Sequence, residues 1–587
     1  MCWRLGATLA IGFFASVVPL GSTAQPISSA HKIDAALDDL LTNGSAPDGV
    51  RVIIRARDAD ARQSLKSRLR AHGDRINADH ASIGAFTATA HAADLRALAD
   101  DPSTETISID AVVEAHQSST NSLLGTELLP DASATGAGVR VAVIDSGLEI
   151  TNDLSANRIL GFYDLTRGDQ VVAVQPYDDY GHGTHVAGLI AGDGTNSKGL
   201  YAGIAPAAKV LALKVLDKNG GGYTSDVIQA IEFILQNQNV FHIDVINLSL
   251  GHPIFESATT DPLVLEVQKA TQAGIIVVVA AGNYGQDPTT GLPAYAGITS
   301  PGDAPSAITV GAVDTHDTIG RGDDTIPVYS SRGPTWYDAY AKPDLVVPGH
   351  HLVSNAALQS TLYLNYPDLR VVGKTGDIAR YQRLSGTSMS TAVTSGTVAL
   401  MLHAAGKYRS YFTPNTVKAL LEWSAIPIPG YDALTQGNGS LNVSGALALV
   451  RKINPAVPVG SYWLTSSVTP ATTIGGLSWP WAQTVIWRNT TGYGSFIDTR
   501  QTAWAQTVIW GNTVIWGSTV IWGSNVVWSS PTLWSSTVIW GNTLIGTTNG
   551  TTVIWGNANV TSSTVIWGSL APTAGVITNN TFANIQQ

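Results

Sequence analysis

Short, continuously apolar segments that alternate with helical stretches are the feature that most constrains the fold of this chain. Strands that are apolar on both faces are typical of a parallel sheet covered by helices on both sides. The pattern therefore predicts a doubly wound α/β domain. The predicted strands are 139–145, 209–215, 243–250, 274–281 and 307–313.

Polar residues follow the carboxyl ends of several predicted strands, where ligands bind in doubly wound sheets. Asp145 ends the first strand, and Asn283 follows the fourth. His182 opens a helix in GHGTHVAG, and Ser388 lies in GTSM, a Gly-rich turn before an apolar helix. An acid that orients an imidazole, an imidazole that takes a proton and a hydroxyl that attacks are the parts of acyl-transfer chemistry. The Asn283 amide and the backbone N–H of Ser388 are suited to stabilise an oxyanion.

Taken singly, these residues have ordinary structural interpretations. An Asp at a strand end commonly forms a turn, and a Ser before a helix commonly caps it. Zinc catalysis at His182 and His185 is disfavoured because HEXXH is absent and no third ligand is evident. An α/β-hydrolase needs GXSXG and the order Ser, acid, His, whereas residues 386–390 read GTSMS and the order here is Asp, His, Ser.

The motifs DSG, GHGTHVAG, AAGN and GTSM occur in the order of the subtilase family, the subtilisin-like serine peptidases, which the chain resembles over residues 136–451. The resemblance implies a serine endopeptidase that needs no cofactor for catalysis. It assigns the triad to Asp145, His182 and Ser388 and an oxyanion donor to Asn283.

The resemblance also implies how protein or peptide substrates bind. We expect a substrate to add as a strand between residues 220–223 and 249–251, through main-chain hydrogen bonds. After the nucleophile, Ser390 and Ala392 replace the Ala and Pro that the family usually has. The loop 284–300 is longer than in simple family members, so a side-chain preference cannot be carried over. The expected substrate-binding residues are Gly220, Gly221, Gly222, Tyr223, Ser249, Leu250 and Gly251.

A structural calcium ion is a further expectation from the resemblance. Asp153 and Asn196 match the neighbourhood of the family's ligands, and oxygen ligands suit calcium. Ordinary polar loop residues would explain the same two side chains equally well.

A smaller unit is predicted before the peptidase domain. Its elements follow the order βαββαβ of a ferredoxin-like α+β unit. By resemblance, residues 25–116 are the family's inhibitory propeptide, a cis partner whose tail 112–116 lies in the cleft, with maturation at His116 or Gln117. The predicted elements are a strand at 50–54, a helix at 59–72, two strands within 76–90, a helix at 91–99 and a strand at 106–110.

The N-terminus predicts export. Arg4 precedes the apolar run 5–20, and small residues follow at 22–24, so residues 1–24 are interpreted as a signal peptide. The alternative is a membrane anchor, for which sixteen residues are short compared with a span of about 20. The only cysteine, Cys2, lies in this peptide. The net charge of -11 argues against a nucleic-acid partner, so we expect a secreted, extracellular protein.

The C-terminal part is predicted to be a separate all-β repeat region. The peptidase domain is placed at 117–452, a linker at 453–480 and the repeats at 481–587. TVIWGN-like hexads recur there, and an even spacing puts every Trp on one side of a strand. Turn residues between four-residue strands allow a stacked solenoid or a tight meander. The repeating tryptophans are Trp504, Trp510, Trp516, Trp522, Trp528, Trp534 and Trp540.

This region contains almost no charge and no recognisable catalytic group. Between Ile453 and Gln587 the charged residues are Arg488, Asp498 and Arg500. An exposed Trp face would attach the protein to a cell surface or matrix, whereas Trp side chains that pack the repeats internally explain the pattern equally well. The alternative function is therefore a surface-attached structural or adhesive protein with a catalytically minor peptidase domain.

Overall fold

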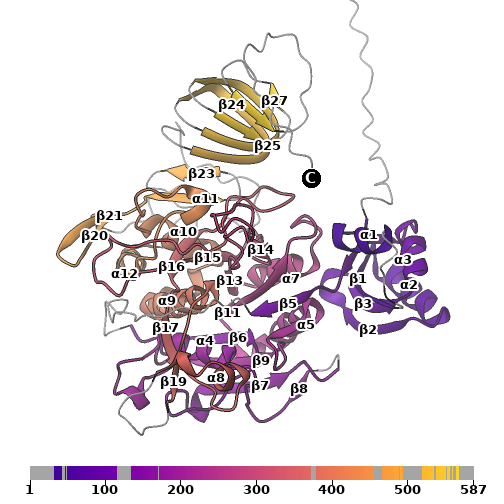
Figure 1. Ribbon diagram of the computed structural model, residues 1–587, viewed down its shortest axis with the longest axis horizontal. Helices are drawn as coiled ribbons and strands as arrows, with labels where there is room; N and C mark the ends of the chain where they lie inside the picture. Colours follow the sequence, from indigo (N-terminus) through magenta and orange to yellow (C-terminus); the bar gives the residue numbers. More distant parts are fainter. Residues whose placement is uncertain are drawn as a thin grey trace, which may run out of the picture.

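The computed structural model describes residues 32–42, 47, 49–115, 134–168, 171–371, 379–454, 466–487, 490–493, 519–534, 537–549, 552–555, 558–559 and 564–567. An N-terminal unit lies beside a central α/β body, and the C-terminal strands form a further sheet (Figure 1). The predicted signal peptide, residues 1–24, lies outside the described residues. Within the described ranges, no helix is long and apolar enough to cross a membrane.

The central body contains an eight-stranded sheet in the order β16-β15-β13-β11-β6-β9-β7-β8. All neighbours are parallel except β7 and β8. The prediction of an α/β domain with a mostly parallel sheet is confirmed. The strands are β6 (Arg140–Asp145), β7 (Ile159–Asp164), β8 (Val172–Ala173), β9 (Lys209–Lys214), β11 (Val245–Leu248), β13 (Ile276–Ala280), β15 (Ile308–Val313) and β16 (Leu345–Pro348).

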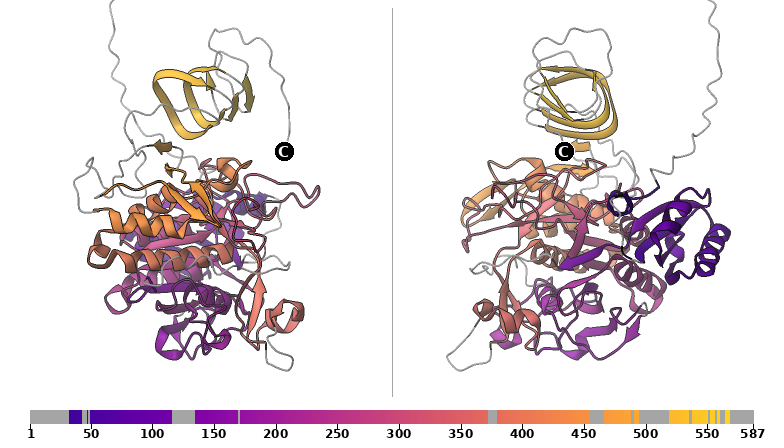
Figure 2. Two further views of the ribbon diagram at one scale, coloured as in Figure 1. Left: turned by 90° about the vertical axis from the view of Figure 1, so that its left-hand side faces the viewer. Right: turned by 45° about the vertical axis from the view of Figure 1, so that its right-hand side comes forward.

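Helices cover both faces of this sheet (Figure 2). On β6, Val141 and Val143 pack into one core and Ala142 and Ile144 into the other, which explains why the strand is apolar throughout. The first core contains α4 (His182–Ala191), α9 (Thr387–Ala405), α10 (Pro414–Ser424) and α12 (Val443–Lys452). The second contains α5 (Thr224–Gln236) and α7 (Pro262–Gln272).

Smaller elements complete the body. A three-stranded sheet in the order β17-β19-β18 lies against α4. The strands of this sheet are β17 (Leu352–Asn355), β18 (Arg370–Val371) and β19 (Tyr381–Leu384). The short helices of the body are α6 (Gln238–Phe241), α8 (Thr361–Asn365) and α11 (Ala433–Gln436).

The N-terminal unit has its own sheet and its own core. The antiparallel sheet has the order β2-β3-β1-β4, and Leu65, Leu69, Leu95 and Leu98 of its two main helices are buried against it. The chain order is β-α-β-β-α-β, as in ferredoxin-like units. The elements are α1 (Ala35–Thr42), β1 (Val50–Ala56), α2 (Ala59–Ala71), β2 (Arg75–His80), β3 (Ala85–Ala90), α3 (Ala92–Ala99) and β4 (Thr104–Ile109).

Part of the predicted linker packs on the central body. The hairpin β20 (Ala471–Ile474) and β21 (Leu477–Pro480) leads to Trp481, which is 5% exposed. The Trp481 ring meets Trp423 of α10 edge-on with centroids 5.6 Å apart, and its Nε1 donates to Thr472 Oγ1 at 2.7 Å. A large aromatic side chain at the start of the predicted repeats is therefore packed against the body.

The described C-terminal strands begin with an antiparallel hairpin and continue as a parallel sheet. In the parallel part, Trp522, Trp540, Trp555 and Trp567 occupy the same register position on successive strands. Consecutive strands of a meander are antiparallel, whereas these described strands are parallel, as the solenoid alternative expects. The strands are β22 (Thr484–Trp487), β23 (Thr490–Tyr493), β24 (Thr519–Trp534), β25 (Thr537–Asn549), β26 (Thr552–Trp555), β27 (Ala558–Asn559) and β28 (Thr564–Trp567).

Candidate active site

Asp145 and His182 meet at the carboxyl edge of the central sheet. Asp145 is the last residue of β6, and His182 is the first residue of α4. His182 Nδ1 lies 2.7 Å from Asp145 Oδ1, and both side chains are buried. A carboxylate on Nδ1 holds the proton there and leaves Nε2 as a base. Among the described residues, His182 Nε2 has no hydrogen-bond partner, so it can accept a proton.

Ser388 is the second residue of α9 and is fully buried. Its hydroxyl donates to the Ser249 carbonyl at 3.0 Å, and Ser249 Oγ donates back to the Ser388 carbonyl at 3.0 Å. Asn247 Nδ2 donates to Ser249 Oγ at 2.9 Å. Ser249, which the sequence placed only in the substrate cleft, therefore also holds the turn that carries Ser388.

The Asn283 side chain is oriented by the residue that precedes Ser388. Asn283 Oδ1 accepts hydrogen bonds from the backbone N–H and the hydroxyl of Thr387, each at 3.1 Å. Its Nδ2 is buried, with no partner in the described part of the chain. A buried donor without a partner costs about 1–3 kcal/mol, which is consistent with a group kept for a ligand. Sequence reasoning missed Thr387, although its place beside the nucleophile in GTSM was a usable signal.

A strand from the N-terminal region occupies the cleft beside these residues. β5 (Val112–Ala115) pairs in antiparallel fashion with both β10 (Gly221–Tyr223) and β12 (Leu250–Pro253), and β12 also pairs with β14 (Thr299–Ser300). Most of the predicted substrate-binding residues therefore lie opposite the same strand, β5. Gly222 needs its hydrogen side chain there, because a Cβ would clash with the Val215 carbonyl.

Gly220 lies one residue before β10 and does not pair with β5. It has a φ of 84°, and a Cβ at this position would clash with the ring of Tyr180. The structure thus places Gly220 as a turn residue that lets the chain enter the cleft strand.

The N-terminal unit meets the central body through buried polar groups. Ser82 Oγ lies 2.8 Å from Glu232 Oε1 of α5 and 2.6 Å from Glu266 Oε2 of α7. His80 Nδ1 lies 3.2 Å from Glu232 Oε2. Burial raises the pKa of Glu266 to about 7, and repulsion from Glu232 adds to this effect. Nothing in the sequence indicated this junction.

His185 has a structural place in the described residues. Its Nε2 lies 3.0 Å from the Leu352 carbonyl and 3.2 Å from the Gln382 carbonyl, which ties α4 to β17 and β19. Burial, and then the nearby His182, lower the pKa of His185 to about 3. His185 is therefore uncharged and holds α4 in place.

The two residues expected to bind calcium do not fit that ion. Asp153 Oδ1 accepts from the Asn196 N–H at 2.7 Å, and its Oδ2 accepts from Asn355 Nδ2 at 2.9 Å and from the Tyr381 hydroxyl at 2.5 Å. The Asn196 side-chain oxygen accepts from Asn152 at 2.9 Å. Calcium needs converging oxygen ligands, whereas here hydrogen-bond donors occupy the carboxylate.

The departures from the family pattern after Ser388 are accommodated locally. Ser390 Oγ donates to the Val347 carbonyl of β16 at 2.9 Å. Gly349 leaves room for this hydroxyl, since a Cβ there would clash with it. Ala392 is buried inside α9. The Ser390 substitution therefore adds a tie between α9 and the sheet beside the nucleophile.

Comparisons with known proteins show the family to which the chain is similar. The peptidase S8 model, which describes the subtilase family, matches residues 136–460. The chain is similar to the serine protease AprX of Bacillus subtilis (strain 168), with 38% identity over 318 residues, 53% of this chain and 67% of that protein. It is similar to subtilisin E of the same organism, with 31% identity over 379 residues, 64% of this chain and 83% of that one. Fervidolysin from Fervidobacterium pennivorans, a keratinolytic enzyme related to subtilisin, has a similar fold, with a TM-score of 0.52 and 20% identity over 68% of this chain and 61% of that chain.

Proposed function

The chain belongs to the subtilase family and is a subtilisin-like serine peptidase, and from this premise we propose that it is a secreted endopeptidase acting through an acyl-enzyme. Asp145, His182 and Ser388 form the catalytic triad. The Asp145–His182 contact of 2.7 Å, with the base nitrogen of His182 left available, is the observation that carries the proposal.

The first chemical step follows from this arrangement. The Ser388 hydroxyl turns from Ser249 to His182, its proton passes to Nε2, and Oγ forms a bond to the scissile carbonyl carbon. Asp145 stabilises the resulting imidazolium. The negative charge on the former carbonyl oxygen is met by Nδ2 of Asn283 and the N–H of Ser388.

The second half regenerates the enzyme. The C–N bond breaks, and the amine leaves with the proton that His182 Nε2 carried. A water molecule then gives a proton to His182 and attacks the ester, which releases the new carboxyl group and restores the Ser388 hydroxyl. Apart from this water molecule and the substrate, no group outside the chain is needed to balance these steps.

Substrates are proteins and peptides that bind as a strand between β10 and β12. The contacts that β5 makes there are main-chain pairs, with Gly222 opposite Val113 and Gly251 opposite Glu114. Recognition through the backbone accepts many sequences, so the substrate range is broad.

The N-terminal unit is the inhibitory propeptide, and its β5 tail blocks the substrate site. Support comes from β5 filling the space between β10 and β12. The predicted cleavage at His116 or Gln117 falls outside the described residues.

The C-terminal repeats attach the enzyme to a cell surface or matrix, because their register repeats Trp on successive strands.

The test of this function is Ser388→Ala. We expect this variant to lose casein hydrolysis and self-processing, and a serine-directed covalent reagent to label the unaltered protein but not the variant. Casein hydrolysis at the full rate by Ser388→Ala would refute the assignment, and circular dichroism checks that the variant is folded.

A further inference from the structure

The segment that leads into α4 contains a buried carboxylate that the mechanism does not use. Asp178 lies four residues before His182 and is 5% exposed. Its Oδ1 accepts from Ser146 Oγ at 2.9 Å and from the Gly181 N–H at 2.7 Å. Its Oδ2 accepts from the N–H and the hydroxyl of Thr184, at 2.8 and 2.7 Å.

These bonds join the two elements that carry Asp145 and His182. Ser146 directly follows Asp145, and its Oγ also accepts from the Gly183 N–H at 2.9 Å. Asp178 and Ser146 together therefore bind three backbone groups around the first turn of α4, namely the N–H of Gly181, of Gly183 and of Thr184. The amides of a first helical turn lack intrahelical partners and favour a negative charge.

The N-cap position itself cannot provide this carboxylate. Gly181 occupies it with a φ of 103°, and a Cβ there would clash with Ser360. A residue with a side chain is therefore excluded at the usual capping position. Asp178 supplies the cap from three residues earlier.

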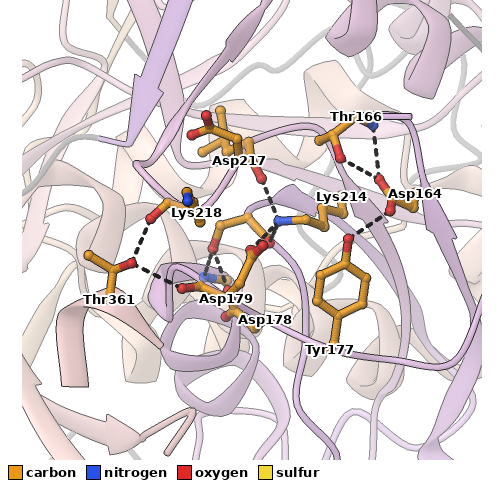
Figure 3. A network of polar contacts seen from close by, with 12 residues as sticks. Asp164, Thr166, Tyr177, Asp178, Asp179, Lys214, Asp217, Lys218 and Thr361 are labelled. Atoms are coloured by element: carbon orange, nitrogen blue, oxygen red, sulfur yellow. Dashed lines mark hydrogen bonds and ion pairs between the residues drawn. The ribbon is translucent and has the colours of Figure 1, made fainter. Parts of the chain in front are cut away.

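The flanks of Asp178 are anchored by other residues, as Figure 3 shows. The Tyr177 hydroxyl donates to Asp164 Oδ2 at 2.7 Å. Lys214 Nζ, at the end of β9, donates to Asp179 Oδ1 and to the Ser146 carbonyl, each at 2.6 Å. The backbone on both sides of Asp178 is thus held in place. The Asp178 carboxylate then connects Ser146, directly after β6, to the first turn of α4.

We propose that Asp178 is a positioning residue of the peptidase, which sets the Asp145–His182 contact by locking the first turn of α4 to Ser146. Within the described residues, the bond to Asp145 is the only hydrogen bond that the His182 ring makes. The position of the imidazole toward Ser388 therefore depends on where its backbone is held. A displacement of about 1 Å in such a site can cost up to about 10²-fold in rate.

The test compares Asp178→Asn with Asp193→Asn in the full chain. Asp193 is a matched control, because it also accepts from the N–H and the hydroxyl of a threonine, Thr195, but in an exposed turn after the far end of α4. Asn keeps the size of the side chain but not its charge or its capacity to accept on both ends. We expect Asp178→Asn to lower kcat on a small peptide substrate by about 10- to 100-fold and to change KM less than twofold, while Asp193→Asn changes neither.

The pH profile separates positioning from a loss of stability. His182 is faced by Asp145 from β6 and by His185 of α4. A looser Asp145 contact stabilises the imidazolium less, so the acid limb of kcat should move to lower pH in Asp178→Asn. Active sites are counted from the final extent of labelling by a serine-directed reagent. A variant with a lower melting temperature but unchanged kcat per labelled site and an unchanged acid limb would overturn the proposal.

Milder variants serve if Asp178→Asn does not fold. Thr184→Val and Ser146→Ala each remove one hydroxyl from the network and keep the backbone. We expect each to shift the acid limb in the same direction, and unchanged profiles in both would overturn the proposal. The inference rests on the proposed function. The two can fail separately, because full activity of Ser388→Ala would refute the triad whatever the Asp178 variants show.

Discussion

The junction at Ser82 predicts that the N-terminal unit binds the peptidase more tightly at low pH than at high pH. Ser82 Oγ carries one proton, yet it contacts two carboxyl groups, at 2.8 Å on Glu232 and 2.6 Å on Glu266. An ionised carboxylate only accepts. One of the two contacts therefore needs a proton from a carboxyl group, and Glu266, whose pKa burial raises to about 7, is the group that supplies it.

The direction of the pH effect follows from the raised pKa. When the unit leaves, water reaches the site and relieves the burial, so the pKa of Glu266 falls toward its ordinary value of 4.5. The loss of Ser82 and His80, which both lower this pKa in the bound state, partly offsets the fall. The bound state therefore holds a proton that the separated state releases. The proton on Glu266 therefore stabilises the bound N-terminal unit fully below pH 4.5, and this stabilisation is lost as pH rises through about 7. Glu266 is faced by Glu232, His80 and Lys269.

The size of the effect has an upper bound. The difference between about 7 and 4.5 corresponds to about 3 kcal/mol, or roughly a 100-fold to 300-fold change in dissociation constant between pH 4.5 and pH 8. Relaxation of the separated surfaces reduces this figure. We therefore expect binding at pH 8 to be weaker than at pH 5 by at least about tenfold.

The assay uses the Ser388→Ala chain with an inserted site for a sequence-specific protease between residues 116 and 133. After cleavage, the dissociation constant of the noncovalent complex is measured from pH 5 to pH 8 by sedimentation. Glu266→Gln provides the decisive comparison, because its amide mimics the protonated carboxyl group and can still donate to Ser82. It should lose the part of the pH dependence that Glu266 supplies. Glu256, whose pKa burial raises to about 8 beside Ser108 and Asp34 of the N-terminal unit, still contributes.

The control for this assay is Glu105→Gln, an exposed side chain paired with Arg55 in the N-terminal unit. This variant should keep the pH dependence of the unaltered protein. A dissociation constant that does not change with pH, or that falls as pH rises, refutes the reasoning, as does a Glu266→Gln variant that keeps the full pH dependence.

Two further predictions concern catalysis and the boundary of the body. Asn283→Ala should keep the melting temperature and lower kcat by about 10²- to 10³-fold, the loss typical of one oxyanion donor; an unchanged rate in steady-state kinetics would remove Asn283 from the site. A chain that ends after Tyr493 should keep its stability and its hydrolysis of soluble casein, whereas one that ends after Lys452 loses the Trp481–Trp423 packing and about 3–5 kcal/mol. Equal melting temperatures for the two truncations would contradict the assignment of Trp481 to the body.

The central sheet was predictable because its signal is local. Residues such as Val141 and Ala142 face different cores, so every position of the strand had to be apolar. The predicted strand 243–250 was less accurate, because the structure divides it into β11 and β12 at Ser249. That division arises from pairing of β12 with β5, a contact between segments far apart in the sequence, which no local pattern encodes.

The supporting residues of the site were not predictable for the same reason. Asp145 and His182 were found through short motifs, but Ser82 and Glu266 are 184 residues apart in the chain. Asp178 stands in DDYGH like any polar loop residue, and only the fold shows that Ser146 comes to meet it. The predicted repeat region begins at Trp481, whereas in the structure the Trp481 ring packs against Trp423 of α10.

Several contacts hold the N-terminal unit, and the β5 pairing and the Ser82 junction respond to different conditions. Asp110 adds a third contact, since its carboxylate accepts from the N–H and the hydroxyl of Ser225 of α5. The pairing of β5 with β10 and β12 is made by backbone groups that do not titrate, and a substrate strand that competes for the cleft displaces only this contact. The Ser82 junction lies on α5 and α7, outside that cleft strand, and responds to pH but not to substrate. Raising the pH therefore weakens the binding of the unit at the Ser82 junction and leaves the β5 pairing in place. It follows that Glu266→Gln should slow activation at pH 8 while leaving kcat of the fully activated enzyme unchanged, which a time course of casein hydrolysis can measure.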